Sequence, residues 1–276
     1  MPKNVKIINL NLFTLKELVI KNTGIENISL EYPYRCCDLK PLYGIIFQEY
    51  IKQYEYWGHC DFDMIFGDIY SFMEEHNYRK FDKFLNLGHL SFYKNTDEVN
   101  NYYKLNGSQY SYIDVLTRNK NFAFDENFGI NSILLKHGLP FFIERIFFDI
   151  SDIYHRFRLS EFCSLTSKDV NYNQQIFCWK DGKVFRYYVE KGQLKKEERM
   201  YIHFKKRPDF HVEFDVRNTN SYFICPLGFV PFDGDITIYD IKSYNPYNAI
   251  RELYECSNYK YNKYKNALVR RIKAIL

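Results

Sequence analysis

The chain has 276 residues, of which 46% are hydrophobic and 26% charged, with only 12 Gly and 8 Pro. This composition can bury a substantial core, and it excludes a stapled mini-protein, a collagen-like chain and a disordered one. The net charge of +4 (38 basic minus 34 acidic residues) is too small to make nucleic acid the default partner, and we expect none.

Alternating strand and helix patterns fill the first half of the chain. The predicted elements are a strand over residues 5–10, a helix opened by a capping box at Thr14 and ending near Gly24, a helix capped by Asp38, a buried strand over 56–60, and a helix from Gly67 to about His76. A strand pair over 84–87 and 90–93 follows, with helices beginning at Thr96 and spanning 127–137. Strand followed by helix is typical of α/β proteins.

The second half is richer in antiparallel strands. We predict strands over 140–150, 201–204 and 222–230, and a hairpin whose arms, 175–180 and 183–189, flank Asp181-Gly182. No low-complexity linker separates the halves, so we predict a single domain over residues 1–247 and a basic amphipathic helix over 248–276.

That last helix carries six basic and no acidic residues between positions 257 and 276. We favour a terminal helix that docks on the domain and exposes a basic face. The alternative is a peripheral contact with anionic lipid, because each basic residue near such a surface adds about 1 kcal/mol.

The cellular compartment is indicated by the cysteines and the N-terminus. Seven cysteines are scattered without a C-x-x-C pair, which is typical of reduced thiols. The first residues lack the unbroken apolar stretch of a signal peptide, and no window has the 18 or so apolar residues that span a bilayer. We therefore expect a cytoplasmic protein, with the inner membrane face as its alternative location.

The most informative segment is residues 57–68, where Asp61 and Asp63 follow a predicted strand. Alternation along an extended chain would turn both carboxylates the same way and send Phe62 into the core. Carboxylate pairs of this kind hold Mg²⁺ or Mn²⁺. A bare D-x-D also occurs by chance in solvated turns, but charges beside a buried strand need a partner, which favours a metal.

In this segment the chain resembles the bacterial glycosyltransferases of capsule and lipopolysaccharide synthesis that have a GT-A-like fold. The resemblance covers most of residues 1–210 and rests on four further blocks, namely residues 37–41, 88–95, 124–126 and 201–207. It implies an α/β, Rossmann-like mixed sheet flanked by helices. Such chains usually begin with an additional strand and helix that carry the nucleotide-base pocket, and here that unit is missing, so the chain is either a fragment or a shortened enzyme.

The resemblance also implies a role for particular residues. Asp61, Asp63 and His203 would hold the divalent cation, Mn²⁺ or Mg²⁺, and the residues implied in donor binding are Lys40, His89, Lys205 and Arg207. Asp125 or Glu126 could act as general base for the acceptor hydroxyl, although acidic residues also suit the N-terminus of a helix. The departing nucleoside diphosphate develops negative charge that a cation and nearby basic residues neutralise.

Three functions remain open from the sequence. The first is transfer of a hexose from a nucleotide sugar to a glycan or lipid-linked acceptor in surface polysaccharide synthesis. The second is a metal-dependent phosphoesterase that uses His59, Asp61, Asp63 and His203. The third is a non-catalytic, truncated transferase-like module that binds a partner or a membrane through residues 248–276.

Overall fold

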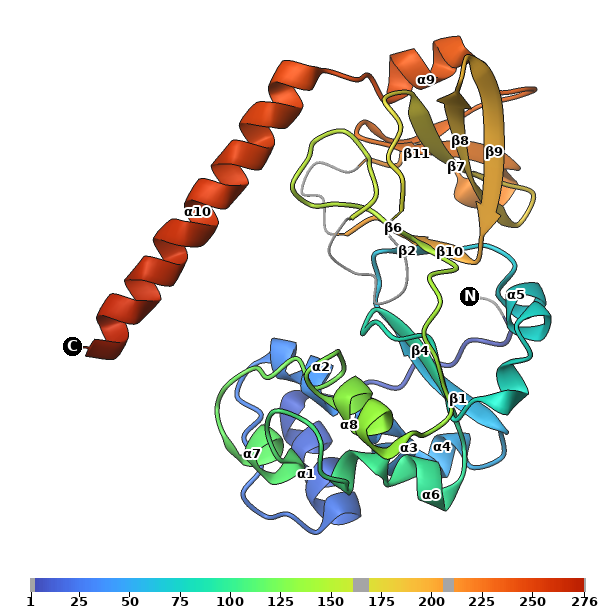
Figure 1. The fold of residues 1–276 in the computed structure, drawn as a ribbon. Coiled ribbons are helices and arrows are strands. Elements are labelled where there is room, and N and C mark those ends of the chain that lie inside the picture. The colour runs from blue at the N-terminus through green and yellow to red at the C-terminus, as the bar shows by residue number, and fades with distance from the viewer. Residues whose placement is uncertain (1–2, 161–168, 206–210, 276) are drawn as a thin grey trace. The chain divides into compact units, whose positions relative to one another are not determined.

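The computed structural model describes residues 3–160, 169–205 and 211–275 and shows a mixed α/β protein (Figure 1). Its chain divides into two compact units. Unit 1 comprises Met1–Asp61 and Asn77–Glu144, and unit 2 comprises Phe62–His76 and Arg145–Leu276. The division runs through the range for which the sequence predicted a single domain, and it separates Asp61 from Asp63 in the D-x-D motif.

Unit 1 contains a four-stranded mixed sheet in the order β1-β4-β3-β5. Its strands are β1 (Tyr56–Cys60), β3 (Lys83–Phe84), β4 (Leu90–Lys94) and β5 (Phe141–Phe142). Strands β3 and β5 pair in parallel, and the other pairs are antiparallel. The prediction of a strand over 56–60 is confirmed, but β1 is an edge strand with only Trp57 and His59 buried.

Helices and short helical turns complete unit 1. They are α1 (Leu12–Thr23), η1 (Pro33–Arg35), α2 (Cys36–Leu39), η2 (Lys40–Leu42), α3 (Tyr43–Ile46), α4 (Gln48–Ile51), η3 (Tyr78–Lys80), α6 (Asp97–Asn100), η4 (Tyr102–Lys104), α7 (Tyr112–Thr117) and α8 (Ile130–His137). These helices pack on the sheet through a shared hydrophobic core. In it the rings of Trp57 and Tyr93 stack with their centroids 4.5 Å apart, and Trp57 Nε1 donates to Asn100 Oδ1 at 2.7 Å. Apolar burial and the satisfied indole N–H together fix the helices beside β1.

The predictions for unit 1 are wrong in several details. Residues 5–10 form no strand. Ile7 is 61% exposed, so the segment gains little apolar burial that would stabilise a strand. Helix α1 begins earlier than predicted because Asn11 caps it by accepting from the Thr14 N–H at 2.8 Å. Asp38 does not cap a helix; it is buried within α2, pairs with Arg35 and accepts from the backbone N–H groups of Phe122 and Phe124.

Unit 2 contains two sheets. The smaller has the order β2-β10-β6 and consists of β2 (Met64–Phe66), β10 (Tyr201–His203) and β6 (Phe148–Asp149). The larger is antiparallel in the order β12-β11-β7-β8-β9, with β7 (Gln175–Lys180), β8 (Lys183–Glu190), β9 (Gln193–Arg199), β11 (Ser221–Cys225) and β12 (Gly228–Pro231). The hairpin at Asp181-Gly182 is confirmed. The strand predicted over 140–150 is instead two strands, β5 and β6, one in each unit.

The helices of unit 2 are α5 (Ile69–Glu75), η5 (Val216–Asn218), α9 (Ile238–Tyr244) and α10 (Ala249–Ile275). Asp68 caps α5 by accepting from the Ser71 N–H, and α10 confirms the predicted terminal helix. The prediction that this helix docks along its apolar face is wrong, because Ile250 and Leu253 are 82% and 70% exposed. In the described parts of the chain, no helix combines the length and apolar composition needed to cross a bilayer.

Candidate functional site: two polar clusters at the D-x-D motif

The D-x-D motif lies in the connection between β1 and β2. Phe62 is fully exposed, so the expectation that it turns into the core is wrong. The reason is that β1 ends at Cys60 and β2 begins at Met64, and the residues between them bend instead of continuing one strand. Asp61 closes the first segment of unit 1, whereas Asp63 belongs to unit 2. Each carboxylate therefore has its own set of partners.

In unit 1, Asp61 belongs to a cluster organised by Lys40, which we call the Lys40 cluster. The Lys40 Nζ donates to Asp61 Oδ1 at 2.8 Å and to the Gly88 carbonyl at 2.7 Å, and it lies 3.2 Å from Asp125 Oδ2. An ammonium group has three N–H donors, and here three oxygens surround it. The backbone supports the same arrangement, since the Asp61 N–H donates to the His89 carbonyl at 2.8 Å.

Burial sets the electrostatics of this cluster. It would lower the pKa of Lys40, but Asp125 and Asp61 outweigh that effect and raise the pKa above its usual value. Burial raises the pKa of Asp125 to about 6, although Lys40 opposes the change. A Cβ on Gly88 would lie 2.4 Å from Asp125 Oδ2, so only glycine lets the chain approach this carboxyl so closely.

Further polar side chains are buried in unit 1. Lys83 donates to the Leu85 carbonyl at 2.6 Å and to Asn131 Oδ1 at 3.1 Å, and burial lowers its pKa to about 7. His59 packs beside the Tyr93 ring, and burial followed by the charge of Lys40 lowers its pKa well below the usual value. His59 is therefore a neutral, enclosed imidazole.

In unit 2, Asp63 belongs to a second cluster, centred on His203 and called the His203 cluster. Asp63 Oδ1 lies 3.5 Å from His203 Nε2, and Asp149 Oδ1 lies 2.9 Å from His203 Nδ1. Strand register places the pair, because His203 of β10 is directly opposite Asp149 of the parallel strand β6. Lys205 adds a positive charge, with its Nζ 3.5 Å from Asp149 Oδ2 and 3.7 Å from Asp152 Oδ1.

The two carboxylates control the protonation of His203. Burial alone would lower its pKa, but hydrogen bonds to Asp149 and then Asp63 outweigh burial and raise the pKa to about 9. Without a competing cation the imidazole is therefore protonated at neutral pH. The Asp149 carboxylate, which contacts Nδ1, fixes the orientation of the ring and directs Nε2 toward Asp63.

This donor set fits a divalent cation. A carboxylate oxygen and an imidazole nitrogen face each other, and the ring's other nitrogen is held by a carboxylate, which is the usual outer support of a metal-bound histidine. Mn²⁺ accepts both oxygen and imidazole donors. Asp149 was not among the residues predicted from the sequence. The signal was an acidic residue inside the apolar run 146–150, where a buried charge requires a partner.

The remaining predicted residues are placed as follows. Asp125 is buried in the Lys40 cluster and Glu126 is exposed; both precede α8 by several residues, so the interpretation of a helix N-terminus is wrong. His89 is buried and supports Asp61 through its carbonyl. Lys40 has three protein partners, and Arg207 lies outside the described residues.

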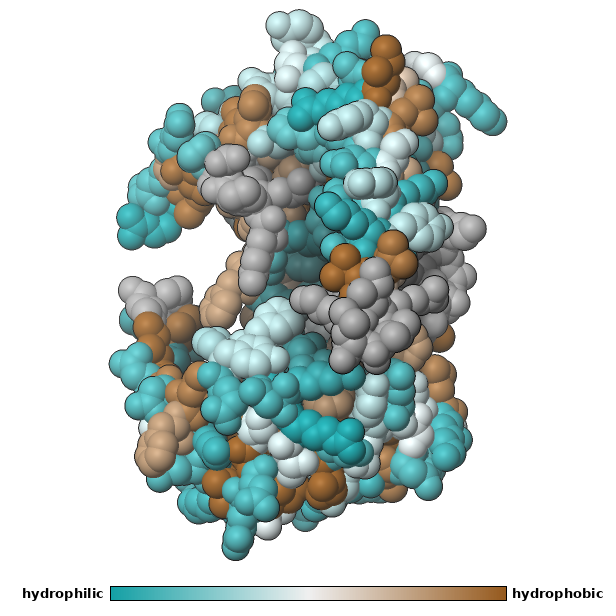
Figure 2. All heavy atoms as spheres, turned by 90° about the vertical axis from the view of Figure 1, so that its left-hand side faces the viewer, coloured by the Kyte–Doolittle hydropathy of each residue, from teal (hydrophilic) through white to brown (hydrophobic). Residues whose placement is uncertain are grey.

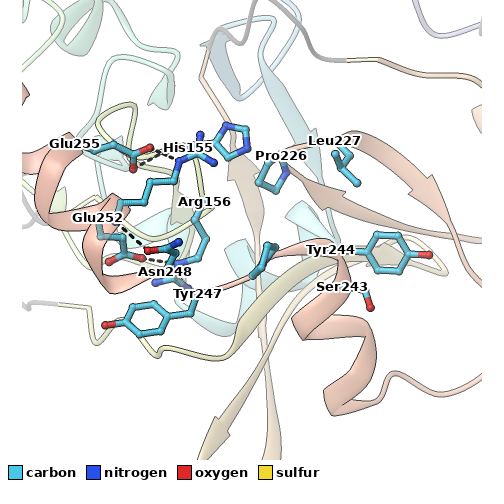
Figure 3. A pocket seen from close by; sticks show the side chains of 12 residues that line it. His155, Arg156, Pro226, Leu227, Ser243, Tyr244, Tyr247, Asn248, Glu252 and Glu255 are labelled. Atoms are coloured by element: carbon cyan, nitrogen blue, oxygen red, sulfur yellow. Dashed lines mark hydrogen bonds and ion pairs between the residues drawn. The ribbon is translucent and has the colours of Figure 1, made fainter.

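Two cavities in unit 2 border α10, with volumes of about 280 and 380 Å³. The first is lined by residues such as Arg156, Tyr244 and Tyr247 (Figure 3). Neither is lined by a residue of the Lys40 or His203 cluster. On the face drawn in Figure 2, apolar side chains occur as small groups among hydrophilic ones.

Comparison with known proteins identifies a family, but the description of that family names no function. No curated protein and no solved structure shows significant similarity to the chain. One family model, described as a family of unknown function, DUF6625, matches residues 1–233, which is most of the chain. The chain therefore belongs to the DUF6625 family.

Proposed function

We propose that the protein is a metal-dependent glycosyltransferase with a GT-A-like fold that moves a hexose from a nucleotide sugar to a glycan or lipid-linked acceptor. The observation that carries this proposal is the facing pair of Asp63 and His203, with Asp149 behind the imidazole. This pair involves the second aspartate of a D-x-D sequence, and the resemblance stated for the sequence implies that D-x-D binds the cation.

Asp63 and His203 are the proposed ligands of Mn²⁺ or Mg²⁺. Asp149 keeps the His203 ring oriented and balances its charge. Asp61 has its Oδ1 on Lys40, so we assign it a structural role within the Lys40 cluster. When bound, the cation would neutralise the negative charge that develops on a departing nucleoside diphosphate.

Basic side chains would help to neutralise the negative charge on the departing nucleoside diphosphate. Lys205 lies beside Asp149 in unit 2, and we propose that it contacts a donor phosphate. Lys40 is fully engaged by oxygens of its own chain, which favours a role in fixing Asp61 over direct donor binding. The proposal thus assigns the two lysines different tasks.

For the general base, the exposed Glu126 is the better candidate. Asp125 has a pKa of about 6, which suits proton transfer near neutral pH, but it is buried against Lys40. We therefore propose that Asp125 positions Lys40 and that Glu126 accepts the proton of the acceptor hydroxyl. Surface polysaccharide synthesis on the cytoplasmic side is the proposed setting.

Calorimetry with Mn²⁺ and UDP or GDP tests the proposal. We expect the nucleotide to bind only with Mn²⁺ present, and Asp63→Asn to abolish this joint binding. Asp68→Asn is the matched control, because asparagine still caps α5 and the site is left intact. Equal nucleotide affinity with and without Mn²⁺, or in Asp63→Asn, would contradict the metal role.

Incubation with UDP-glucose and Mn²⁺ separates transfer from phosphoester hydrolysis. Slow release of UDP with free glucose, through water replacing the acceptor, supports the transferase. Release of UMP with glucose 1-phosphate, from hydrolysis of the diphosphate bond, would instead support the phosphoesterase that the sequence left open.

A further inference from the structure

The terminal helix α10 carries an apolar stripe that the rest of unit 2 leaves uncovered. Six of its residues are between 60% and 82% exposed: Ile250, Leu253, Tyr254, Tyr261, Tyr264 and Leu268. At 3.6 residues per turn they fall within a sector of about 100°, which defines one face of the helix. We call this face the α10 stripe.

The helix is attached to unit 2 by the opposite face. Glu252 accepts from Arg156 at 2.6 Å and from Arg158 at 2.7 Å, and Glu255 accepts from the His155 N–H at 3.2 Å. Figure 3 shows both glutamates directed from α10 toward residues 155–156. These glutamates lie roughly 150° around the helix from the centre of the stripe. The ion pairs therefore hold the helix with its apolar face turned outward.

Beyond these first turns the helix stands away from its unit. A cavity of about 380 Å³ lies between this part of α10, including Tyr259 and Lys260, and Ile153 and Tyr154; of the stripe residues, Tyr264 at its edge also lines this cavity. Close packing therefore contributes little to this part of the helix, and helices without tertiary packing are marginal in water. A surface that covers the stripe would stabilise it.

The charge of the helix indicates what kind of surface would cover the stripe. Residues 257–276 contain Lys260, Lys263, Lys265, Arg270, Arg271 and Lys273 and no acidic residue. Two copies of α10 packed through their stripes would bring twelve like charges together, which disfavours a second chain as occupant. An apolar face rich in tyrosine and leucine on a basic helix suits the plane between headgroups and acyl chains of an anionic bilayer.

We propose that α10 is a membrane-surface anchor, which lays the α10 stripe into the interface of an anionic bilayer while lysines such as Lys260 and Lys265 contact the headgroups. This inference goes beyond the proposed function and does not depend on it, because it concerns residues outside both clusters. Its consequence is a protein that works at a lipid surface, attached through the end of unit 2.

Vesicle sedimentation with the full chain tests the anchor. We expect binding to vesicles of phosphatidylcholine with 30% phosphatidylglycerol and little binding to phosphatidylcholine alone. Lys260→Gln with Lys265→Gln should weaken partitioning roughly 30-fold, from about 1 kcal/mol per basic residue. Leu253→Gln with Leu268→Gln should weaken it more than tenfold, because two leucines lose their apolar environment.

The control is Asn262→Gln, a polar change on α10 outside the stripe, which should leave partitioning unchanged. Far-ultraviolet circular dichroism of every variant checks that the helix content is kept. Failure to bind anionic vesicles would overturn the proposal, and so would equal binding to neutral ones. A dimer in light scattering that Leu253→Gln with Leu268→Gln makes monomeric would assign the stripe to a second copy and would also overturn it.

Discussion

The Lys40 cluster of unit 1 and the His203 cluster of unit 2 each hold one carboxylate of the same D-x-D motif, yet their chemistry differs. Asp61 faces an ammonium group that already neutralises it. Asp63 faces an imidazole whose far side is held by another carboxylate. An ammonium cannot ligate a cation, whereas an imidazole can exchange its proton for one. We therefore propose different tasks for the two aspartates of one motif, a structural one for Asp61 and cation binding for Asp63.

The largest effect is expected at Lys40, and it tests the structural role of the Lys40 cluster. Lys40→Met would leave Asp125 buried without its charge partner, which costs about 3–5 kcal/mol of unfolding free energy. Urea unfolding at pH 7 measures this. Lys21→Met is the control, since its ion pair with Glu49 is exposed and should matter by less than about 1 kcal/mol. A similar small loss for both variants would remove the distinction between the clusters.

The next effect concerns the support of His203. Asp149→Asn keeps an acceptor oxygen near Nδ1 but removes its charge, so Mn²⁺ affinity should fall about 10- to 100-fold. Calorimetry gives the affinity, and Asp152→Asn, changed at an exposed carboxylate, should alter it less than about threefold. If both variants bind Mn²⁺ like the unmodified chain, Asp149 has no part in a metal site.

A smaller, graded effect follows from Lys83 in unit 1. Burial lowers the pKa of this side chain to about 7, below its unfolded value near 10.5. Between those values the unfolded chain binds a proton that the folded chain does not, so this residue makes stability rise with pH. His203, with its raised pKa, acts in the opposite direction in both chains, so the test is the difference: from pH 7 to 9.5 the unfolding free energy should rise more, or fall less, in the unmodified chain than in Lys83→Met. An unchanged pH slope in Lys83→Met would show that Lys83 stays charged.

The smallest structural effect is expected at Glu126. Glu126→Gln should leave stability within about 0.5 kcal/mol, because the side chain is exposed. Transfer activity, once an acceptor is identified, should fall about 10²- to 10⁴-fold if Glu126 is the base. Asp125→Asn should instead show itself mainly in stability. If Asp125→Asn instead lost activity and Glu126→Gln lost stability, Asp125 would be assigned as the general base.

Sequence patterns predicted the local elements better than their assembly. The β7–β8 hairpin and the end of α1 at Gly24 were predictable because turn chemistry is local. The role of Asp38 was not, since its partners Phe122 and Phe124 are more than 80 positions away. The division of 140–150 between two sheets was also unpredictable, because an apolar run does not reveal which strand it will pair with.

The candidate site shows the same limit. Asp63 and His203 could be named from motif and resemblance, but Asp149 is joined to His203 only by the pairing of β6 with β10. The exposure of Phe62 could not be inferred either, because alternation holds only while the strand continues. The pairing of β6 with β10 decided the first outcome, and the end of β1 at Cys60 decided the second.

The central claim is that His203 and Asp63 hold a divalent cation, and pulsed electron paramagnetic resonance of bound Mn²⁺ tests it most directly. Nitrogen modulation from a directly coordinated imidazole should appear in the unmodified chain and disappear in His203→Gln, while His76→Gln, changed outside the His203 cluster, should keep it. A bound Mn²⁺ that shows no imidazole nitrogen, or the same nitrogen signal in His203→Gln, would contradict the claim.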